Sequence, residues 1–292
     1  MTKDEQWLLE EKYNGEQSAP VFNESLDEIK YKYPWGEGFF TDCQRLAAGE
    51  PLGYVIGHVP FLGCTIYVTS EIEQTPPSAY SHAHNSDSSS KTGIKAKQFT
   101  LIPRAETEWW VEQAIGVIQA DAAALPPRIL DLCAGSGAIG VAVAHALPET
   151  RVDFAEIDPR LLPTIEKNCR ENDINDERYK IIQSDLFTAI TGTYDFILSN
   201  PPYIDPELDR TQSSVKNFEP HLALYGGADG MELIADIISK APSFLALYGQ
   251  LWIEHEPEQS DAIASLATSH GFTATTHMDQ FTVQRYSVLM LE

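Results

Sequence analysis

The stretch Asp131-Leu132-Cys133-Ala134-Gly135-Ser136-Gly137 decides the fold, because it joins a predicted strand to a predicted helix. Residues 128–132 form a short apolar run of the length of a buried strand, and residues 138–146 have helical spacing. Glycines at such a junction allow the backbone to approach a bound nucleotide closely. We therefore expect this glycine loop at the carboxyl edge of a sheet, where α/β proteins bind their ligands.

Strand-like and helix-like segments alternate through residues 99–292, which predicts a doubly wound, Rossmann-like α/β sheet. The C-terminal segments 273–277 and 285–291 are extended in pattern and could pair as a hairpin. The other expected strands cover residues 152–157, 180–183, 196–199 and 250–254, and the expected helices cover residues 106–120, 159–172, 231–241 and 260–270.

The first 98 residues have a different pattern. Residues 1–50 are acidic, and helical periodicity around residues 6–12, 24–33 and 39–48 predicts a small helical region for substrate recognition. Residues 54–57 and 64–68 predict a connecting β-hairpin, and residues 73–98 have the composition of a flexible insertion. The expected domains are residues 1–50, 51–98 and 99–292.

The net charge restricts the class of partner. The 292 residues include 43 Asp and Glu but 20 Lys and Arg, a formal net charge of −23. Such a surface repels phosphate backbones and anionic lipid, so we expect no direct nucleic-acid contact and no membrane association. The acidity suits a basic protein partner, although it could also serve solubility alone.

Cysteine spacing and the N-terminus suggest an intracellular protein without a metal site. The four cysteines are far apart and form no Cys-x-x-Cys pair, so we expect reduced thiols and no zinc. No apolar run has the roughly 20 residues of a membrane span. The acidic N-terminus has neither the pattern of a signal peptide nor that of a transit peptide.

Asn200-Pro201-Pro202-Tyr203, the NPPY loop, follows the strand expected at residues 196–199. Proline ends strands, so this loop should be rigid. The Asn200 side-chain carbonyl and the next backbone carbonyl offer two acceptors to a planar NH2 group. They could direct its nitrogen lone pair at an electrophile, with Tyr203 over the flat face of the substrate. A purely structural turn remains the alternative.

Three further positions suggest a nucleoside ligand. Glu156, followed by Ile157, ends the apolar run 152–155, where its carboxylate can accept hydrogen bonds from ribose hydroxyls. Asp185 and Leu186 follow the next strand and suit an adenine amine and ring. The alternative roles are a solvated strand-end acid for Glu156 and a helix cap for Asp185.

The glycine loop lacks the dinucleotide fingerprint, because Cys133 replaces its first glycine. A nucleoside cofactor without phosphates, next to a loop that orients an NH2 group, implies methyl transfer from S-adenosylmethionine. The loop residues expected to contact this cofactor are Asp131, Cys133, Ala134, Gly135, Ser136 and Gly137.

From Glu50 to the C-terminus, apart from the insertion, the chain resembles the HemK/PrmC family of methyltransferases. These enzymes modify the glutamine amide in the Gly-Gly-Gln motif of class I peptide-chain release factors. The segments that carry the resemblance, besides the glycine and NPPY loops, are Glu50-Pro51-Leu52-Gly53-Tyr54-Val55-Ile56-Gly57, Leu101-Ile102-Pro103-Arg104-Ala105-Glu106-Thr107-Glu108, Ser184-Asp185-Leu186-Phe187, Glu219-Pro220-His221-Leu222-Ala223-Leu224, Gly226-Gly227 and Asp229-Gly230.

The resemblance implies roles for further residues. Phe99, Pro103 and Thr107 would line the pocket, Asn200 would also contact the cofactor, and the N-terminal helices would grip the release factor. The chain departs from the family at Ala105, where proline is usual, and in its shorter stretch before Glu50. The residues implied to bind the substrate are Asn200, Pro201, Tyr203 and Glu219.

The leading hypothesis is therefore glutamine methylation of a release factor by a monomer. The insertion resembles that of an organellar eukaryotic member, which suggests mitochondria, with the cytoplasm as the alternative. An amino-adenine DNA or RNA methyltransferase could use the same NPPY loop, although phosphate contacts need more lysine and arginine. A non-enzymatic scaffold that retains the fold is the third possibility.

Overall fold

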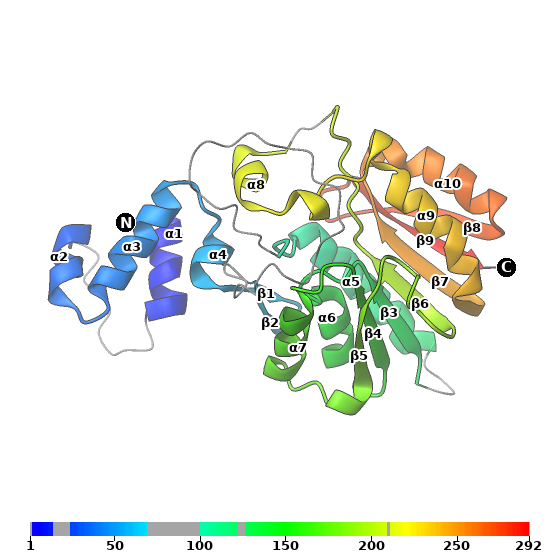
Figure 1. Ribbon diagram of the computed structural model, residues 1–292, viewed down its shortest axis with the longest axis horizontal. Helices are drawn as coiled ribbons and strands as arrows, with labels where there is room; N and C mark the ends of the chain where they lie inside the picture. Colours follow the sequence, from blue (N-terminus) through cyan, green and yellow to red (C-terminus); the bar gives the residue numbers. More distant parts are fainter. Residues whose placement is uncertain (1, 14–23, 69–99, 122–125, 209–210, 292) are drawn as a thin grey trace, which may run out of the picture.

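The main domain is a seven-stranded sheet with helices on both faces, and a separate group of helices lies beside it (Figure 1). The computed structural model describes residues 2–13, 24–68, 100–121, 126–208 and 211–291. Phe99 and the expected insertion at residues 73–98 lie outside the described residues.

The strand order of the sheet is β5-β4-β3-β6-β7-β9-β8. Strands β3 to β7 are parallel, and β9 pairs antiparallel with both β7 and β8. This order confirms the predicted α/β class and the terminal hairpin. The strands are β3 (Arg128–Leu132), β4 (Arg151–Glu156), β5 (Tyr179–Gln183), β6 (Tyr194–Ser199), β7 (Leu245–Glu254), β8 (Phe272–Met278) and β9 (Gln284–Leu291).

The order of the strands changes side at β3, which lies between β4 and β6. Strands β4 and β5 follow on one side of β3, whereas β6 and β7 lie on its other side. Because parallel strands end at one edge, the loops after β3, β4, β5 and β6 meet there. Ligands of open α/β sheets bind at such a switch point.

The central strands of the sheet are buried on both faces, so they are largely apolar on both sides. Neighbouring residues of β3 alternate: Ile129 packs into one core cluster and Leu130 into the other. The first cluster contains residues of α5 (Ala105–Asp121), α6 (Ala138–Ala146) and α7 (Leu162–Glu171), and the second contains residues of α9 (Glu232–Lys240) and α10 (Ser260–Ser269).

The N-terminal helices form their own small core. Helix α1 (Lys3–Leu8) continues into a π-helical turn, Leu9–Tyr13. Their core cluster joins Leu8, Ile29, Phe39 and Val55, whose side chains are almost fully buried. The other helices of this group are α2 (Leu26–Lys32), α3 (Gly36–Ala47) and α4 (Leu52–Ile56).

The expected strand at residues 54–57 is wrong, because this segment ends the short helix α4. Pro51 precedes the helix, and Gly57 ends it with φ 101° and an N–H that donates to Gly53 O over 2.8 Å. Glycine adopts this left-handed geometry without strain. The hairpin itself exists, with β1 (His58–Phe61) and β2 (Cys64–Tyr67).

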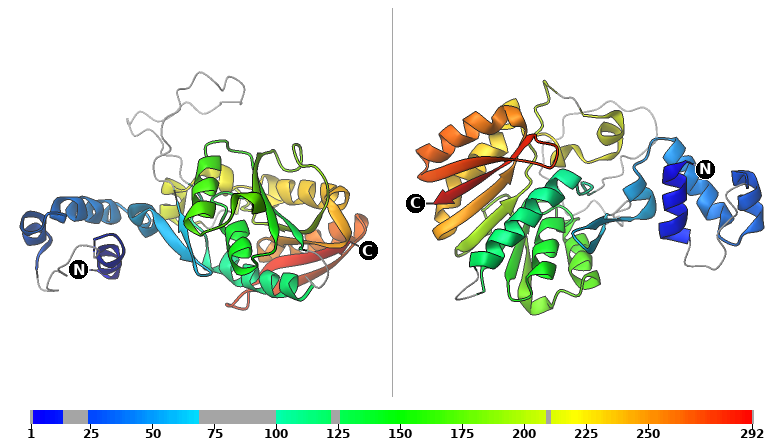
Figure 2. Two further views of the ribbon diagram at one scale, coloured as in Figure 1. Left: turned by 90° about the horizontal axis from the view of Figure 1, so that it is seen from below. Right: turned by 180° about the vertical axis from the view of Figure 1, so that it is seen from behind.

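Side-chain amides attach the hairpin to the main domain. Asn168 on α7 accepts from Tyr67 N at 2.8 Å and donates to Tyr67 O at 3.1 Å. Asn172 accepts from Thr65 N and donates to Thr65 O, each over 2.9 Å. The hairpin thus lies between the helical group and the sheet, as Figure 2 shows from two further sides. The division of the chain at residues 50 and 98 stays a prediction.

Among the described residues, no helix has the length and apolar character needed to cross a membrane. In that same part of the chain, His, Cys, Asp and Glu side chains do not gather into a group that could hold a metal ion.

Candidate active site

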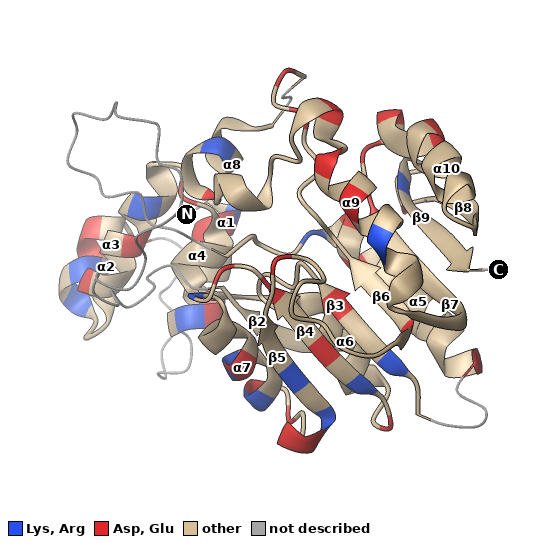
Figure 3. Ribbon diagram, turned by 45° about the vertical axis from the view of Figure 1, so that its right-hand side comes forward, with Lys and Arg blue, Asp and Glu red and all other residues tan. Residues whose placement is uncertain are grey.

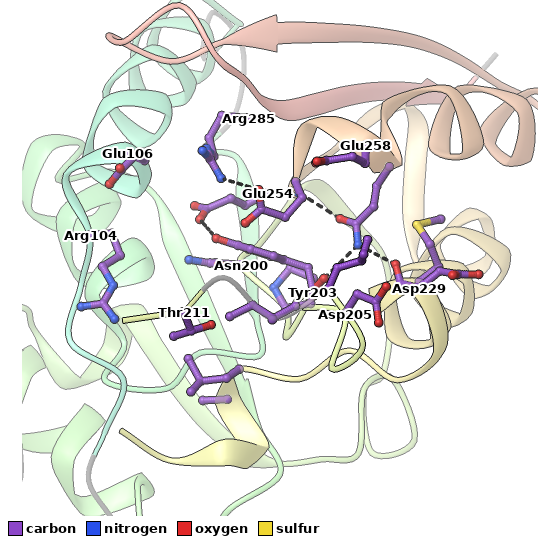
Figure 4. A pocket seen from close by; sticks show the side chains of 18 of the residues that line it. Arg104, Glu106, Asn200, Tyr203, Asp205, Thr211, Asp229, Glu254, Glu258 and Arg285 are labelled. Atoms are coloured by element: carbon purple, nitrogen blue, oxygen red, sulfur yellow. Dashed lines mark hydrogen bonds and ion pairs between the residues drawn. The ribbon is translucent and has the colours of Figure 1, made fainter. Parts of the chain in front are cut away.

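Two cavities meet at the NPPY loop. One has a volume of about 650 Å³ and is bordered by the loops after β3, β4 and β5; we call it the cofactor-side cavity. The other, of about 930 Å³, is the substrate-side cavity (Figure 4). Asn200 lines both cavities, whereas Pro202 borders the first and Pro201 the second. The loop therefore forms the boundary across which a group could be transferred.

Backbone packing fixes the NPPY loop from behind. Ser199, the last residue of β6, donates its hydroxyl to Leu132 O over 2.8 Å. A Cβ on Gly226 would come within 2.5 Å of Pro202 O, and one on Gly230 within 1.9 Å of Tyr203 O. Only glycine permits this approach. The family-like glycines at these positions thus support the loop.

The amide of Asn200 is oriented by a chain of hydrogen bonds. Its Nδ2 donates to Thr107 Oγ1 over 3.0 Å, and Thr107 Oγ1 donates to Glu254 Oε2 over 2.7 Å. A hydroxyl has one proton to donate, so Thr107 accepts from Asn200 and donates to Glu254. The Asn200 carbonyl oxygen is thereby directed away from Thr107, as required of a substrate acceptor.

Glu254, at the end of β7, is the centre of this network. Its Oε2 also accepts from Trp110 Nε1 over 2.7 Å, and its Oε1 accepts from the Tyr203 hydroxyl over 2.9 Å. Burial raises the pKa of Glu254 above its usual range, and the hydrogen bonds from Trp110, Thr107 and Tyr203 oppose that rise. Three donors to one carboxylate favour its ionised form.

The Tyr203 side chain is held by the same carboxylate. Burial, followed by the charge of Glu254, raises the pKa of the Tyr203 hydroxyl well above its usual value. Tyr203 therefore keeps its proton and donates it to Glu254. Its backbone carbonyl accepts from Gln259 Nε2 over 2.8 Å. Tyr203 lines the substrate-side cavity, and its contact with a substrate stays a prediction.

Glu156 is a buried carboxylate that lines the cofactor-side cavity. It ends β4, and its Oε2 accepts from Gly135 N over 2.7 Å while Oε1 accepts from Asp158 N over 2.8 Å. Each carboxylate oxygen has two acceptor sites, so each can take one more hydrogen bond. Burial raises the pKa of Glu156, whereas these backbone donors lower it. The residue thus fits a ligand with neighbouring hydroxyls.

The glycine loop forms another part of the wall of the cofactor-side cavity. Cys133 and Gly135 border the cavity with φ values of 62° and 57°, and a Cβ on Gly135 would meet no protein atom within 4 Å. Asp131 is fully buried; its Oδ2 accepts from Gly140 N over 2.8 Å, whereas no hydrogen-bond partner for Oδ1 is found among the described residues. Burial raises the pKa of Asp131 to about 8.

The expected cofactor residues divide into two groups. Those that border the cofactor-side cavity are Cys133, Gly135, Glu156, Ile157, Asp185, Leu186 and Asn200. Asp131 and Ser136 instead make contacts that fix the glycine loop. Asp131 accepts from Gly140 N at the start of α6, and Ser136 O accepts from Asn168. Ala134 and Gly137 lie in the same turn, where Gly137 N donates to Ala134 O. Their direct contacts with a cofactor stay predictions.

Two residues implied by the family resemblance have supporting contacts. Thr107 is buried between Asn200 and Glu254. Glu219 borders the cofactor-side cavity and accepts from Arg104 Nη2 over 2.6 Å. This ion pair joins the segment before α5 to the segment after α8 (Ser213–Phe218). Substrate contact by Glu219 and pocket contact by Pro103 remain predictions.

The substrate-side cavity is strongly acidic. Arg104 and Arg285 are its basic residues, and Figure 4 shows them on the side of Asn200 that faces α5 and β9. Acidic positions also gather on the loops and helix starts beside α9 and α10 (Figure 3). The acids that line the cavity are Glu106, Asp205, Asp229, Glu254, Glu256 and Glu258.

Several residues of the site were not predicted from the sequence. Glu254, Gln259 and Arg285 come from segments without a recognisable motif, although Glu254 ends a predicted strand as Glu156 does. Glu50 borders the cofactor-side cavity and pairs with Arg45 of α3 through contacts of 2.6 and 2.9 Å. The position of Glu254 at a strand end was the one available signal.

The sheet order, the glycine loop and the Glu156 cavity define a class I methyltransferase that uses S-adenosylmethionine. The family model described as Methyltransferase small domain matches residues 117–219. The hMettl16 catalytic domain in complex with MAT2A 3'UTR hairpin 6 has this fold, with a TM-score of 0.52 at 16% identity, over 66% of this chain and 72% of that one.

Sequence relatives narrow the class further. The Release factor glutamine methyltransferase of Francisella tularensis is 37% identical over 230 residues, 78% of this chain and 70% of the relative. That of Rhodopirellula baltica is 38% identical over 189 residues, 63% of this chain and 64% of the relative. The chain belongs to the release factor glutamine methyltransferase family, which confirms the resemblance carried by its sequence motifs.

Proposed function

We propose that this methyltransferase acts on the glutamine side-chain amide in the Gly-Gly-Gln motif of a class I peptide-chain release factor. The observation that carries the proposal is the orientation of Asn200 at the boundary of the two cavities. Its Nδ2 is engaged by Thr107, so its carbonyl oxygen is the atom offered to a substrate. An amide NH2 is the matching donor.

The NPPY loop would activate that amide. When bound, S-adenosylmethionine supplies a methyl group already activated by its sulfonium. Asn200 Oδ1 and the Pro201 carbonyl would accept the two amide hydrogens, which directs the nitrogen lone pair across the boundary. A nitrogen–carbon bond forms as the sulfur–carbon bond breaks, and the amide nitrogen then loses one proton to water. Carbonyl oxygens near the nitrogen stabilise the positive charge that develops there.

The shape and charge of the substrate-side cavity support a protein substrate. Its volume of about 930 Å³ admits more than one side chain, and acids outnumber the basic residues Arg104 and Arg285 in its lining. A release-factor segment that binds ribosomal RNA is basic, and acidic walls complement it. The N-terminal helices, which extend beyond the sheet domain, are proposed to hold a more distant part of the same substrate (Figure 1).

The decisive experiment is methyl transfer from radiolabelled S-adenosylmethionine to a purified release factor. The parent release factor should be labelled, and a variant with Gly-Gly-Ala in place of Gly-Gly-Gln should not. Mass spectrometry of the tryptic peptide should place one added methyl group on the glutamine. Equal labelling of both release factors would exclude this glutamine as the target.

A parallel assay with oligonucleotides tests the alternative that the protein methylates the amino group of adenine in DNA or RNA. Binding that depends on phosphate contacts weakens steeply with salt. We expect no methylation of adenine-containing DNA or RNA even at low salt, because the acids lining the substrate-side cavity repel phosphate. Salt-sensitive adenine methylation would favour that alternative instead.

Cellular location and oligomeric state complete the proposal. We propose a mitochondrial enzyme that acts as a monomer, based on the family resemblance. Fractionation with an antibody against the native protein, and light scattering of the purified chain, test these two statements. Enrichment in the cytosol would favour the cytoplasmic alternative.

A further inference from the structure

A buried carboxylate outside the recognised motifs connects both ends of the NPPY loop to the fold. Glu254 is 1% exposed and accepts hydrogen bonds from Thr107, Trp110 and Tyr203. Thr107 in turn accepts from Asn200. We propose that Glu254 is a positioning residue for methyl transfer, which fixes the orientation of the Asn200 amide through Thr107 and the Tyr203 ring directly.

The direction of each hydrogen bond carries this inference. Glu254 Oε2 accepts from Trp110 Nε1, and the Thr107 hydroxyl donates its one proton to the same oxygen. The Thr107 oxygen then faces Asn200 as an acceptor, and only the NH2 side of the Asn200 amide can satisfy it. One buried carboxyl group therefore determines which end of the Asn200 amide faces the substrate.

This orientation decides whether the loop can bind an amide substrate. In the observed arrangement, Asn200 Oδ1 meets the donor hydrogens of the substrate. If the amide rotated by half a turn, two NH2 groups would face each other without an acceptor between them. An asparagine without a fixed partner on Thr107 would populate both orientations, and the second is unproductive.

Tyr203 adds a second contact to the same carboxylate. Its hydroxyl donates to Glu254 Oε1, whereas Thr107 and Trp110 donate to Oε2. The first and last residues of the NPPY loop are thus positioned by the two oxygens of one side chain. Figure 4 shows Glu254 between Arg285 and the Tyr203 ring, beside the Asn200 amide.

Substitutions of Thr107 test the inference, which rests on the proposed role of Asn200 as amide acceptor. Thr107→Val keeps the shape but removes the hydroxyl, whereas Thr107→Ser keeps the hydroxyl. We expect kcat to fall about 10-fold or more in Thr107→Val, the scale of losing one buried hydrogen bond, and to stay within about threefold of the parent in Thr107→Ser. The Kd for S-adenosylhomocysteine should change little in both.

Substitutions of Glu254 give the complementary test. In Glu254→Gln, the amide oxygen can still accept from Thr107 and Trp110 while its NH2 group faces Tyr203, so kcat should fall less than in Glu254→Leu, which has no acceptor. Ser287→Ala is the control for stability: the Ser287 hydroxyl, on β9, bonds to His255, the residue that follows β7, over 2.8 Å and is not part of the Glu254 network. It should lower Tm without lowering kcat.

Nuclear magnetic resonance gives a readout that needs no substrate. The Asn200 side-chain NH2 signal, assigned by its loss in Asn200→Ala, should exchange slowly with solvent in the parent and in Thr107→Ser but rapidly in Thr107→Val. Failure of the proposed function would abolish glutamine labelling yet leave this pattern intact. A folded Thr107→Val protein with parental kcat, or with a parental Asn200 signal, would overturn the inference.

Discussion

The two cavities on either side of Asn200 are built in different ways. The cofactor-side cavity is bordered by residues that end or follow β3, β4, β5 and β6 and by residues 216–223, and its polar centre, Glu156, bonds to backbone N–H groups of the loops after β3 and β4. The substrate-side cavity joins segments from residue 101 to residue 285, and its polar centre, Glu254, bonds to side chains from distant segments.

The difference between the two cavities separates cofactor binding from the methyl-transfer step. Glu156 is held by backbone N–H groups, so its orientation does not depend on the side chains of other residues. The substrate-side cavity depends on a chain of side chains, each of which has one correct orientation. We therefore expect substitutions on the first side to change cofactor affinity and substitutions on the second to change turnover.

The largest effect is expected for Asn200→Ala, which removes a polar side chain that lines both cavities. Turnover should fall about 100-fold, the scale of removing one preorganised polar contact of roughly 3 kcal/mol. Cofactor affinity should remain nearly parental, because Glu156 and the glycine loop are intact. Steady-state kinetics and calorimetry with S-adenosylhomocysteine measure the two quantities. A large loss of cofactor affinity would show that the division between the cavities is incorrect.

A smaller effect, on cofactor affinity and not on turnover, is expected for Glu156→Gln. A glutamine cannot accept from both Gly135 N and Asp158 N, because one of its terminal atoms is a donor. Losing one charge-assisted hydrogen bond of roughly 1.5 to 3 kcal/mol corresponds to an increase in Kd of about 10- to 100-fold. At saturating cofactor, kcat should stay within about threefold of the parent.

Asp158→Asn is the matched control for Glu156→Gln. Asp158 also borders the cofactor-side cavity, but its carboxylate binds Arg160 at the surface. Its substitution should leave Kd within about twofold, since exposed ion pairs contribute little. Equal losses in the two variants would mean that negative charge near the cavity, and not the Glu156 hydrogen bonds, governs affinity.

The same difference explains how much of the site the sequence could predict. Glu156 lies at the end of one predicted strand and Asp185 comes soon after the next, so local pattern was enough to place both at the cavity. Glu254 and its partner Thr107 are 147 residues apart in sequence, and no local pattern records their contact.

The fold shows a similar limit. Helix α4 has only five residues, too short for periodicity to distinguish it from a strand, and Gly57 decided its end. Strand β7 begins at Leu245, five residues before its expected start, and the added part contains an irregularity: Tyr248 adopts φ 63° and the register of pairing with β6 shifts before Gln250. Long strands and helices with strong periodicity were predicted within a few residues.

A weaker effect is expected from neutralising acids of the substrate-side cavity. Glu106→Gln and Glu258→Gln should each raise KM for a basic release factor about threefold at low salt, with kcat nearly unchanged. The increase should shrink as salt screens the charges. Glu177→Gln, on the exposed turn Asp176–Arg178 before β5, is the control and should not change KM. A salt-independent increase would contradict the electrostatic explanation.

The smallest effect is the expected change of cofactor affinity with pH. Burial raises the pKa of Glu156, so this carboxylate takes up a proton at a higher pH than an ordinary glutamate. Ribose hydroxyls donate to the ionised form, so protonation should weaken binding. We expect the Kd for S-adenosylhomocysteine to rise as pH falls from 7.5 to 5.5, by less than about threefold.

Asp131 must be separated from Glu156 in that measurement, because it lies beneath the same loop and burial raises its pKa to about 8. Its carboxyl is therefore already mostly protonated at pH 7.5, where the Kd range begins. Asp131→Asn should therefore retain the rise in Kd between pH 7.5 and 5.5, whereas Glu156→Gln should lose it. If Asp131→Asn abolished the rise and Glu156→Gln kept it, the buried acid under the glycine loop would be the group that senses pH.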